Sequence, residues 1–188
     1  MKEKLTAAAI RLFDKKGFSE TSIQDIVESL GVTKGTFYYY FSSKEELLKS
    51  IHLGYIDELV ARQISIINND EQNSKNKLFE IVYMLIHDIK EHGASAKVFF
   101  REIRHLNEEN YQLITKKRDQ FRFNIEYLLK EGIEKGDFRR DLNVPIIAFG
   151  ILGVTNWSYQ WYNPEGAATD REVAEAFTEM ILKGIEFK

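Results

Sequence analysis

Residues 21–47 read TSIQDIVESLGVTKGTFYYYFSSKEEL, which predicts two short helices joined by a tight turn and a third helix directly after them. Gly31 marks the break between the first two helices, because glycine readily ends a helix. The second helix exposes small or polar side chains instead of an apolar face, namely Lys34, Gly35, Tyr38 and Tyr39. This layout is typical of a helix-turn-helix, whose second helix enters the major groove of DNA.

Capping residues predict where these helices begin. Thr21 and Gln24 have the spacing of a capping box at the start of the first helix. Thr33 is placed to cap the second helix, and Ser43 and Glu46 form a capping box for the third.

Helical periodicity continues on both sides of this segment, and no alternating strand pattern persists. Upstream, the apolar stripe Leu5–Phe13 predicts a first helix that Gly17 closes in a left-handed conformation. Downstream, a polar loop is expected at 68–77, with glycine breaks at Gly93, Gly132 and Gly136. The further helices are expected at 44–67, 75–91, 94–107, 109–132, 143–162 and 170–186.

The fold class predicted is therefore all-α. We expect a three-helix helix-turn-helix head over residues 1–47, which would bind DNA. A larger helical body over residues 48–188 would bind a ligand and form the dimer.

Composition indicates an ordinary globular protein, with 44% hydrophobic and 29% charged residues. The net charge is -3, and residues 1–50 hold 8 Lys/Arg against 7 Asp/Glu, so the expected head is nearly neutral. DNA binding would therefore depend on a few well-placed cations rather than on a basic surface.

Several function classes find no support in the sequence. There is no cysteine, which excludes disulfides and thiolate metal sites, and the four histidines show no metal-ligand spacing. A nucleophile elbow and a phosphate-binding glycine loop are also missing, so neither an enzyme nor a cofactor is predicted. The N-terminus lacks a signal-peptide core and residues 142–163 would span a membrane poorly, so we expect a cytoplasmic protein without a membrane partner.

A helix that reads a groove needs small or polar residues at its start and hydroxyls or cations that hold phosphates beside it. Thr33, Lys34, Gly35 and Thr36 meet the first need. The second is met by Tyr38, Tyr39 and Lys44, together with Thr21 and Ser22 at the start of a helix. The alternative is a helical interaction scaffold with a tyrosine-rich surface and no DNA binding.

Residues 21–47 also resemble the DNA-binding head of the TetR family of bacterial regulators. The shared features are Thr21, an Asp-Ile pair at 25–26, the run GVTKGTFYYYF at 31–41, and SKEEL at 43–47. Ala9, Phe13 and Gly17 fit the first helix of that family, and Tyr40 stands where histidine is commoner.

The resemblance implies a role for each matching position. Base or near-base contacts are expected from Thr33, Lys34, Gly35 and Tyr39. Phosphate contacts are expected from Thr21, Ser22, Thr36, Tyr38 and Lys44. Family members are homodimers, so a palindromic operator is expected, with recognition helices about 34–36 Å apart. Repression is the usual mode of the family.

For the body, the resemblance implies an inducer site, and a dimer face made by the last two helices. The small residues Gly150 and Gly153 permit close helix approach, and the expected apolar knobs are Phe177, Met180, Ile181 and Ile185. The alternative is that these side chains form the core of the chain itself.

The effector is expected to be a small lipophilic molecule. The run NWSYQWYNPEG at 156–166 resembles one in TetR members that sense acyl-CoA thioesters, whereas a lipophilic drug or aromatic compound is the rival class. The candidate ligand-binding residues, which would supply aromatic lining, phosphate partners and one amide, are Phe99, Phe100, Arg101, Arg104, Arg118, Phe121, Arg122, Asn156, Trp157 and Trp161. Two alternatives stay open: core or interface packing for the tryptophans, and salt bridges to Glu102, Glu108 or Glu126 for the arginines.

Overall fold

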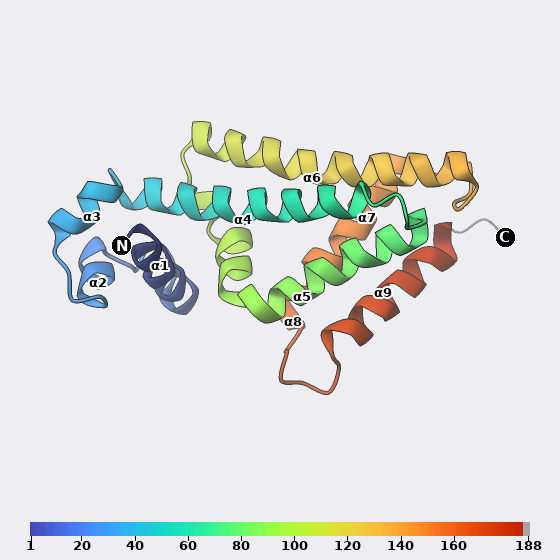
Figure 1. The fold of residues 1–188 in the computed structure, drawn as a ribbon. Helices are drawn as coiled ribbons and strands as arrows, with labels where there is room; N and C mark the ends of the chain where they lie inside the picture. The colour runs from blue at the N-terminus through green and yellow to red at the C-terminus, as the bar shows by residue number, and fades with distance from the viewer. Residues whose placement is uncertain (186–188) are drawn as a thin grey trace. The chain divides into compact units, whose positions relative to one another are not determined.

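The computed structural model describes residues 1–185, and within this range helices are the only extended regular elements, as the sequence predicts (Figure 1). The predicted helix at 170–186 is found from residue 170 onward, and residue 186 lies outside the described range. The elements in chain order are α1 (Lys2–Lys16), α2 (Ile23–Glu28), α3 (Lys34–Tyr40), α4 (Lys44–Ile67), α5 (Ser74–Arg101), the 3-10 helix η1 (Ile103–His105), α6 (Glu108–Lys135), α7 (Val144–Asn156), α8 (Ser158–Trp161) and α9 (Asp170–Ile185).

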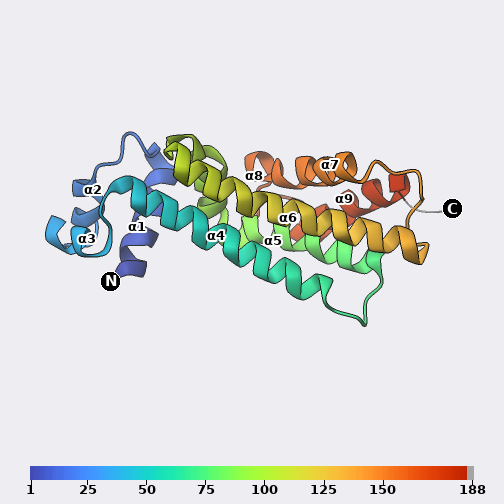
Figure 2. The ribbon, with the colours of Figure 1, turned by 90° about the horizontal axis from the view of Figure 1, so that it is seen from above.

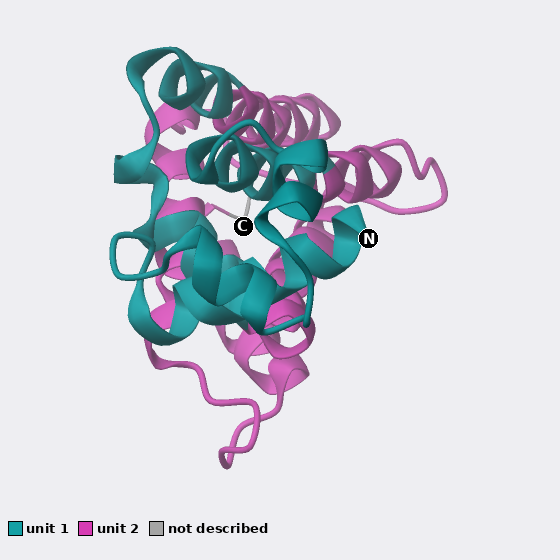
Figure 3. Cartoon of the chain, turned by 90° about the vertical axis from the view of Figure 1, so that its left-hand side faces the viewer, with its two compact units in different colours: residues 1–57, 94–116 teal, residues 58–93, 117–188 magenta. Residues whose placement is uncertain are grey.

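The chain forms two compact units (Figure 3). Unit 1 contains Met1–Asp57 and Ala94–Lys116, so it joins the three N-terminal helices to parts of α4, α5 and α6. Unit 2 contains Glu58–Gly93 and Lys117–Lys188. The functional boundary between residues 47 and 48 stays a prediction.

The helix-turn-helix packs through one apolar face from each of its helices, and α2 contacts both α1 and α3. Its buried side chains include Phe13 of α1, Ile26 of α2 and Phe37 of α3. Burial of each such side chain contributes about 1.5–3 kcal/mol to folding, so these three residues fix the arrangement of the short helices.

Helix ends in the head differ from the prediction at two points. The capping box of α2 is made by Ser22 and Asp25, not by Thr21 and Gln24, because the helix starts one residue later. Gly17 ends α1 with φ 85 and ψ 161, so its φ is positive as expected but its conformation is not left-handed helical. The predicted cap of α3 is confirmed, since the Thr33 hydroxyl accepts a hydrogen bond from the Thr36 N–H.

In unit 2, α7 contacts α8 and α9 (Figure 2). The single helix predicted at 143–162 is instead divided between α7 and α8 at Trp157. None of the helices in residues 1–185 has the length and apolar character needed to cross a membrane.

The predicted break near Gly93 is present one residue earlier. Helix α5 covers the two helices predicted at 75–91 and 94–107 up to Arg101, but His92 has non-helical dihedral angles (φ -129, ψ 30) and kinks the chain between them. The predicted break at Gly132 is wrong. Gly132 lies inside α6, where a Cβ would come within 2.3 Å of the Phe138 ring. That glycine therefore permits close packing and does not end the helix, whereas Gly136 does follow the end of α6 with φ 80.

Candidate nucleic-acid interface

The start of α3 presents a small, polar surface. The Thr33 hydroxyl accepts from the Thr36 N–H at 3.3 Å and lies 3.3 Å from the Thr36 hydroxyl. Lys34 and Gly35 are exposed directly beside it. An oxygen that accepts a backbone hydrogen bond keeps its own O–H as a donor, so this surface can both donate to base edges and approach them closely.

Two tyrosines extend this surface along α3. Tyr39 is 82% exposed and Tyr38 is 54% exposed, although the neighbouring, inward-facing Phe37 is fully buried. The ring of Tyr39 meets that of Tyr40 edge to face at 4.8 Å, and Tyr38 meets Phe37 in the same way at 5.5 Å. These contacts hold the two rings at the surface, where their hydroxyls can donate to phosphates.

Gly35 is not required by the fold. It lies within the regular helix α3, and a Cβ at this position would meet only the Thr33 Oγ1, at an ordinary 3.5 Å. Glycine destabilises a helix relative to alanine by roughly 0.5–1 kcal/mol, so the absence of a side chain here has a cost in stability. Close approach of a ligand to the backbone would account for that cost.

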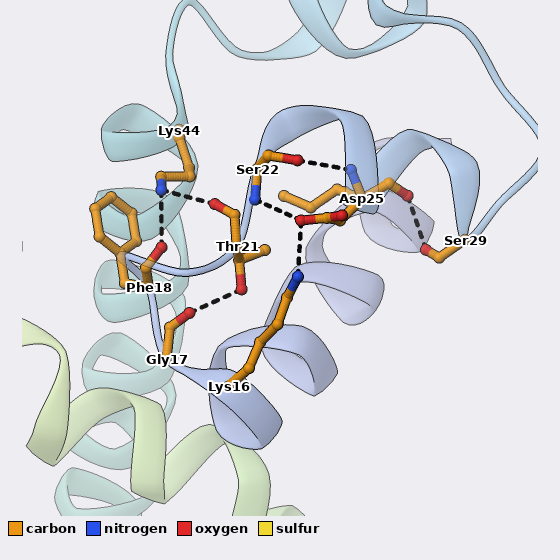
Figure 4. Close-up of polar contacts among 9 residues, drawn as sticks. Lys16, Gly17, Phe18, Thr21, Ser22, Asp25, Ser29 and Lys44 are labelled. Carbon is orange, nitrogen blue, oxygen red and sulfur yellow. Dashed lines mark hydrogen bonds and ion pairs between the residues drawn. The ribbon is translucent and has the colours of Figure 1, made fainter.

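The start of α2 carries a second set of polar groups (Figure 4). The Asp25 N–H donates to the Ser22 hydroxyl at 3.0 Å, and the Ser22 N–H donates to the Asp25 carboxylate at 2.7 Å. The Lys16 ammonium donates to the same carboxylate at 2.8 Å. The Lys16 hydrogen bond, followed by those from Ser22, lowers the pKa of Asp25 to about 2. Ser22 is exposed, so its O–H can reach a phosphate.

Thr21 does not fit the contact predicted for it. Its side chain is fully buried, and its hydroxyl donates to the Gly17 carbonyl at 2.8 Å. Its N–H donates to the Phe18 carbonyl at 3.2 Å. Both donors of Thr21 therefore stabilise the loop between α1 and α2, and we remove it from the set of phosphate ligands.

Lys44 also acts inside the head (Figure 4). Its ammonium donates to the carbonyls of Phe18 and Thr21, both at 2.7 Å, and lies 4.2 Å from the centre of the Phe18 ring. Burial lowers its pKa. Two of its three donors are thus committed to the α1–α2 loop, which favours a bracing role over the phosphate contact that the sequence suggested.

The residues predicted to line an effector site are divided between the two units. Phe99, Phe100, Arg101 and Arg104 lie in unit 1, where Phe99 is buried against the rings of His52, Tyr55 and Phe100. Arg101 is paired at 3.9 Å with both Asp14 and Glu102. For Arg101 the structure thus gives the salt bridge considered as an alternative.

The other six residues lie in unit 2: Arg118, Phe121, Arg122, Asn156, Trp157 and Trp161. Arg122 forms ion pairs with Glu126 and, at 3.3 Å, with Asp119, and its guanidinium stacks on Phe123 and Phe149. Trp157 is 62% exposed and Trp161 is 50% exposed, whereas Phe121 is buried. In this unit the tryptophans belong to the surface rather than to an enclosed site.

Sequence reasoning missed a buried polar layer in unit 2. Gln63 is fully buried and donates to the Phe121 carbonyl at 2.9 Å, while it accepts from the Asn124 amide at 2.8 Å. Asp88, also buried, pairs with Arg62 at 2.5 Å and with His92 at 3.2 Å through one carboxylate oxygen. The sequence signal for this layer is a polar residue within an otherwise apolar helical stripe.

An apolar surface lies on α7, α8 and α9 of unit 2. Its exposed side chains include Ile146, at 64%, and Phe149, at 60%, as well as Trp157, Trp161 and Met180. The predicted small residues Gly150 and Gly153 are exposed there, and Phe177 contacts Trp161 with ring centres 6.1 Å apart. Ile181 is half-buried. Ile185 is buried within unit 2, so its side chain does not belong to this surface.

The helix-turn-helix with its exposed, small-residue α3 face defines a DNA-binding protein of the helix-turn-helix class. Residues 5–51 match the family described as "Bacterial regulatory proteins, tetR family", and residues 71–185 match "Tetracyclin repressor-like, C-terminal domain". The chain therefore belongs to the TetR family and is a transcription regulator.

Similar proteins support the same assignment. The transcriptional repressor KstR2 of Mycobacterium tuberculosis is 29% identical over 182 residues, which cover 96% of this chain and 90% of KstR2. The solved KstR2 structure matches with a TM-score of 0.89 over 100% of this chain and 95% of that one. PfmR from Thermus thermophilus is 30% identical, with a TM-score of 0.88 and coverage of 97% and 99%. AibR, solved with isovaleryl coenzyme A and operator DNA, has a TM-score of 0.85 over 95% and 96% of the two chains, and at 23% identity it shows the fold alone.

Proposed function

We propose that this chain is a ligand-responsive transcriptional repressor that binds a palindromic operator as a homodimer. DNA binding is supported above all by the surface at the start of α3, where Gly35, a glycine that the fold does not require, lies between polar residues. Base or near-base contacts are assigned to Thr33, Lys34, Gly35 and Tyr39, and phosphate contacts to Ser22, Thr36 and Tyr38. Helices α2 and α3 would make these contacts by hydrogen bonding.

The exposed apolar surface on α7–α9 supports the homodimer. Large contiguous apolar surfaces are uncommon on monomeric proteins and usually mark an interaction site. A two-fold axis through this surface would supply two recognition helices for two half-sites of a palindrome. The dimer face proposed here includes Ile146, Phe149, Gly150, Gly153, Trp157, Trp161, Phe177, Met180 and Ile181.

The effector is proposed to be a small lipophilic molecule, and an acyl-CoA thioester is the class to test first. AibR was solved with isovaleryl coenzyme A together with operator DNA, so a protein of this fold can carry such a ligand. The relative KstR2 is a ketosteroid transcriptional regulator, which also connects this fold with an apolar compound class. A lipophilic drug or aromatic compound is the second candidate.

A mobility-shift assay with the DNA that flanks the chain's own gene tests this proposal. We expect a specific shifted complex that isovaleryl coenzyme A, or a longer acyl-CoA in a matched series, releases. Free fatty acids and cationic dyes are tested in parallel, and release by the dyes alone would favour the second effector class. If neither this DNA nor a random-sequence duplex library yields a specific complex, the chain is a helical interaction scaffold instead.

A further inference from the structure

A short segment of unit 1, residues 102–110, contacts the DNA-binding head. It leads from the end of α5 through η1 into the first turn of α6. Glu102 in this segment is only 3% exposed, and its carboxylate accepts from the Phe18 N–H at 3.4 Å and contacts His105 Nε2 at 3.3 Å. A carboxylate is costly to bury unless it is hydrogen-bonded, so the position of Glu102 depends on these partners.

The residue that Glu102 holds, Phe18, is fixed from several sides. Its ring stacks on His105 with centres 5.2 Å apart and meets Phe13 edge to face at 5.3 Å. The Lys44 ammonium lies over the ring and also binds the Phe18 carbonyl. Phe18 belongs to the loop between α1 and α2, so segment 102–110 fixes the loop that leads directly into Ser22 and α2.

A second contact joins the same segment to the chain just after α3. The Glu45 carboxylate accepts from the Asn107 N–H and from the Asn110 side-chain amide, both at 2.9 Å. The Asn107 side chain in turn accepts from the Asn110 N–H, which caps the start of α6. The Asn107 and Asn110 hydrogen bonds lower the pKa of Glu45, so the charged form that makes both contacts is favoured.

These two contacts enclose the helix-turn-helix in sequence. One holds the loop before α2, and the other holds the first turn of α4 directly after α3. The helix α6 continues without a break from Glu108 to Lys135, and its length extends from unit 1 into unit 2. Segment 102–110 therefore contacts the chain on both sides of the helix-turn-helix.

We propose that Glu45 and Glu102 are positioning residues for operator binding, which fasten α2 and α3 to segment 102–110 at two points. This inference rests on the proposed DNA-binding function. We do not assign either residue a DNA contact, because both carboxylates are engaged within the protein and a carboxylate repels phosphate. The direction of the change in operator affinity separates a positioning role from a purely electrostatic effect of the negative charge. Removing a negative charge near DNA by itself strengthens binding, whereas removing a positioning contact weakens it.

The experiment measures operator affinity by fluorescence anisotropy, on the full chain and on an operator selected with the wild-type protein. Glu45→Ala and Glu102→Ala are each expected to weaken binding about fivefold or more, since each removes hydrogen bonds to a charged group. Glu45→Gln keeps an oxygen that can accept from Asn107, so its affinity should stay close to that of the wild type. Glu108→Ala is the matched control, because its carboxylate accepts a hydrogen bond from Gln112 within α6 instead of one from the head, and it should not weaken binding.

A second measurement does not need DNA. The chain has no cysteine, so spin labels at Lys15→Cys and Lys116→Cys report one distance within unit 1 when labelled chains are diluted with unlabelled ones. Glu102→Ala should broaden this distance distribution, and Glu108→Ala should not. If Glu102→Ala fails to fold, Glu45→Ala carries both measurements. Wild-type operator affinity or an unbroadened distribution in folded variants would overturn the inference. If the wild-type protein bound no operator at all, the proposed function itself would be wrong.

Discussion

Replacement of Gly35 by alanine should move stability and DNA affinity in opposite directions. In the free protein the new methyl group meets only Thr33 Oγ1 at 3.5 Å, so it fits without strain. Alanine should stabilise the helix by about 0.5 kcal/mol at this position near the helix start. For a chain of this size that corresponds to a rise of about 1–2 °C in Tm.

The same methyl group should weaken operator binding. If Gly35 lies against base edges, as proposed, the added group must overpack a close contact at a cost of roughly 1–3 kcal/mol. That cost corresponds to a loss of about 5- to 150-fold in affinity. Thermal unfolding of the free protein and fluorescence anisotropy with a selected operator measure the two effects on one preparation.

Gly54→Ala is the matched control for this experiment. Gly54 lies inside α4 with open space where its Cβ would be, so alanine should stabilise the chain and leave operator affinity unchanged. If Gly35→Ala binds the operator as tightly as the wild type, the backbone of α3 does not approach the bases and the assignment of this surface is wrong.

Three further predictions follow from the same geometry. Lys34→Ala should reduce the slope of log affinity against log salt by up to about 0.9, the contribution of one phosphate, if its ammonium also lies near the DNA backbone. Lys44→Ala should weaken binding and leave this slope unchanged. A reduced slope for Lys44→Ala would restore its role as a phosphate ligand. Ile146→Asp should convert the proposed homodimer to a monomer in size-exclusion light scattering, while Leu113→Asp in unit 1 should not. A dimeric Ile146→Asp protein would exclude this face as the dimer interface. The pKa of Asp25 is lowered from 3.8 to about 2, so its contribution to stability should be complete above about pH 4 and should be lost as the pH falls toward 2. Urea unfolding should therefore show a smaller loss of stability over this range for Asp25→Asn than for the wild type. An equal loss in both proteins would contradict the stabilising role of the Asp25 carboxylate.

The sequence predicted the head well because its signals are local. Helical periodicity, Gly31 and the cap at Thr33 act within a few residues of one another, so they define α1–α3 without knowledge of the rest of the chain. The error at Thr21 is a matter of one residue in the start of α2. It changed the chemistry, however, because the true cap, Ser22, is exposed and Thr21 is buried.

Other features depended on contacts between distant residues and could not be predicted in this way. Lys44 has the side chain of a phosphate ligand, but its ammonium binds the carbonyls of Thr21 and Phe18, which lie 23 and 26 residues away along the chain. Gly132 has the local signature of a helix break, but the nearby Phe138 ring explains why a glycine stands inside α6 at this position. The buried positions of Gln63 and Asp88 likewise depend on how α4, α5 and α6 pack.

We propose above all that the start of α3 reads DNA sequence. Its most direct test is the ratio of affinities for a selected operator and for a duplex of the same composition with its base pairs shuffled. We expect a ratio of at least about 1,000 for the wild type, as for specific DNA-binding proteins in general. Gly35→Ala and Tyr39→Ala should reduce this ratio. Equal affinity of the wild-type protein for the two duplexes would contradict the account.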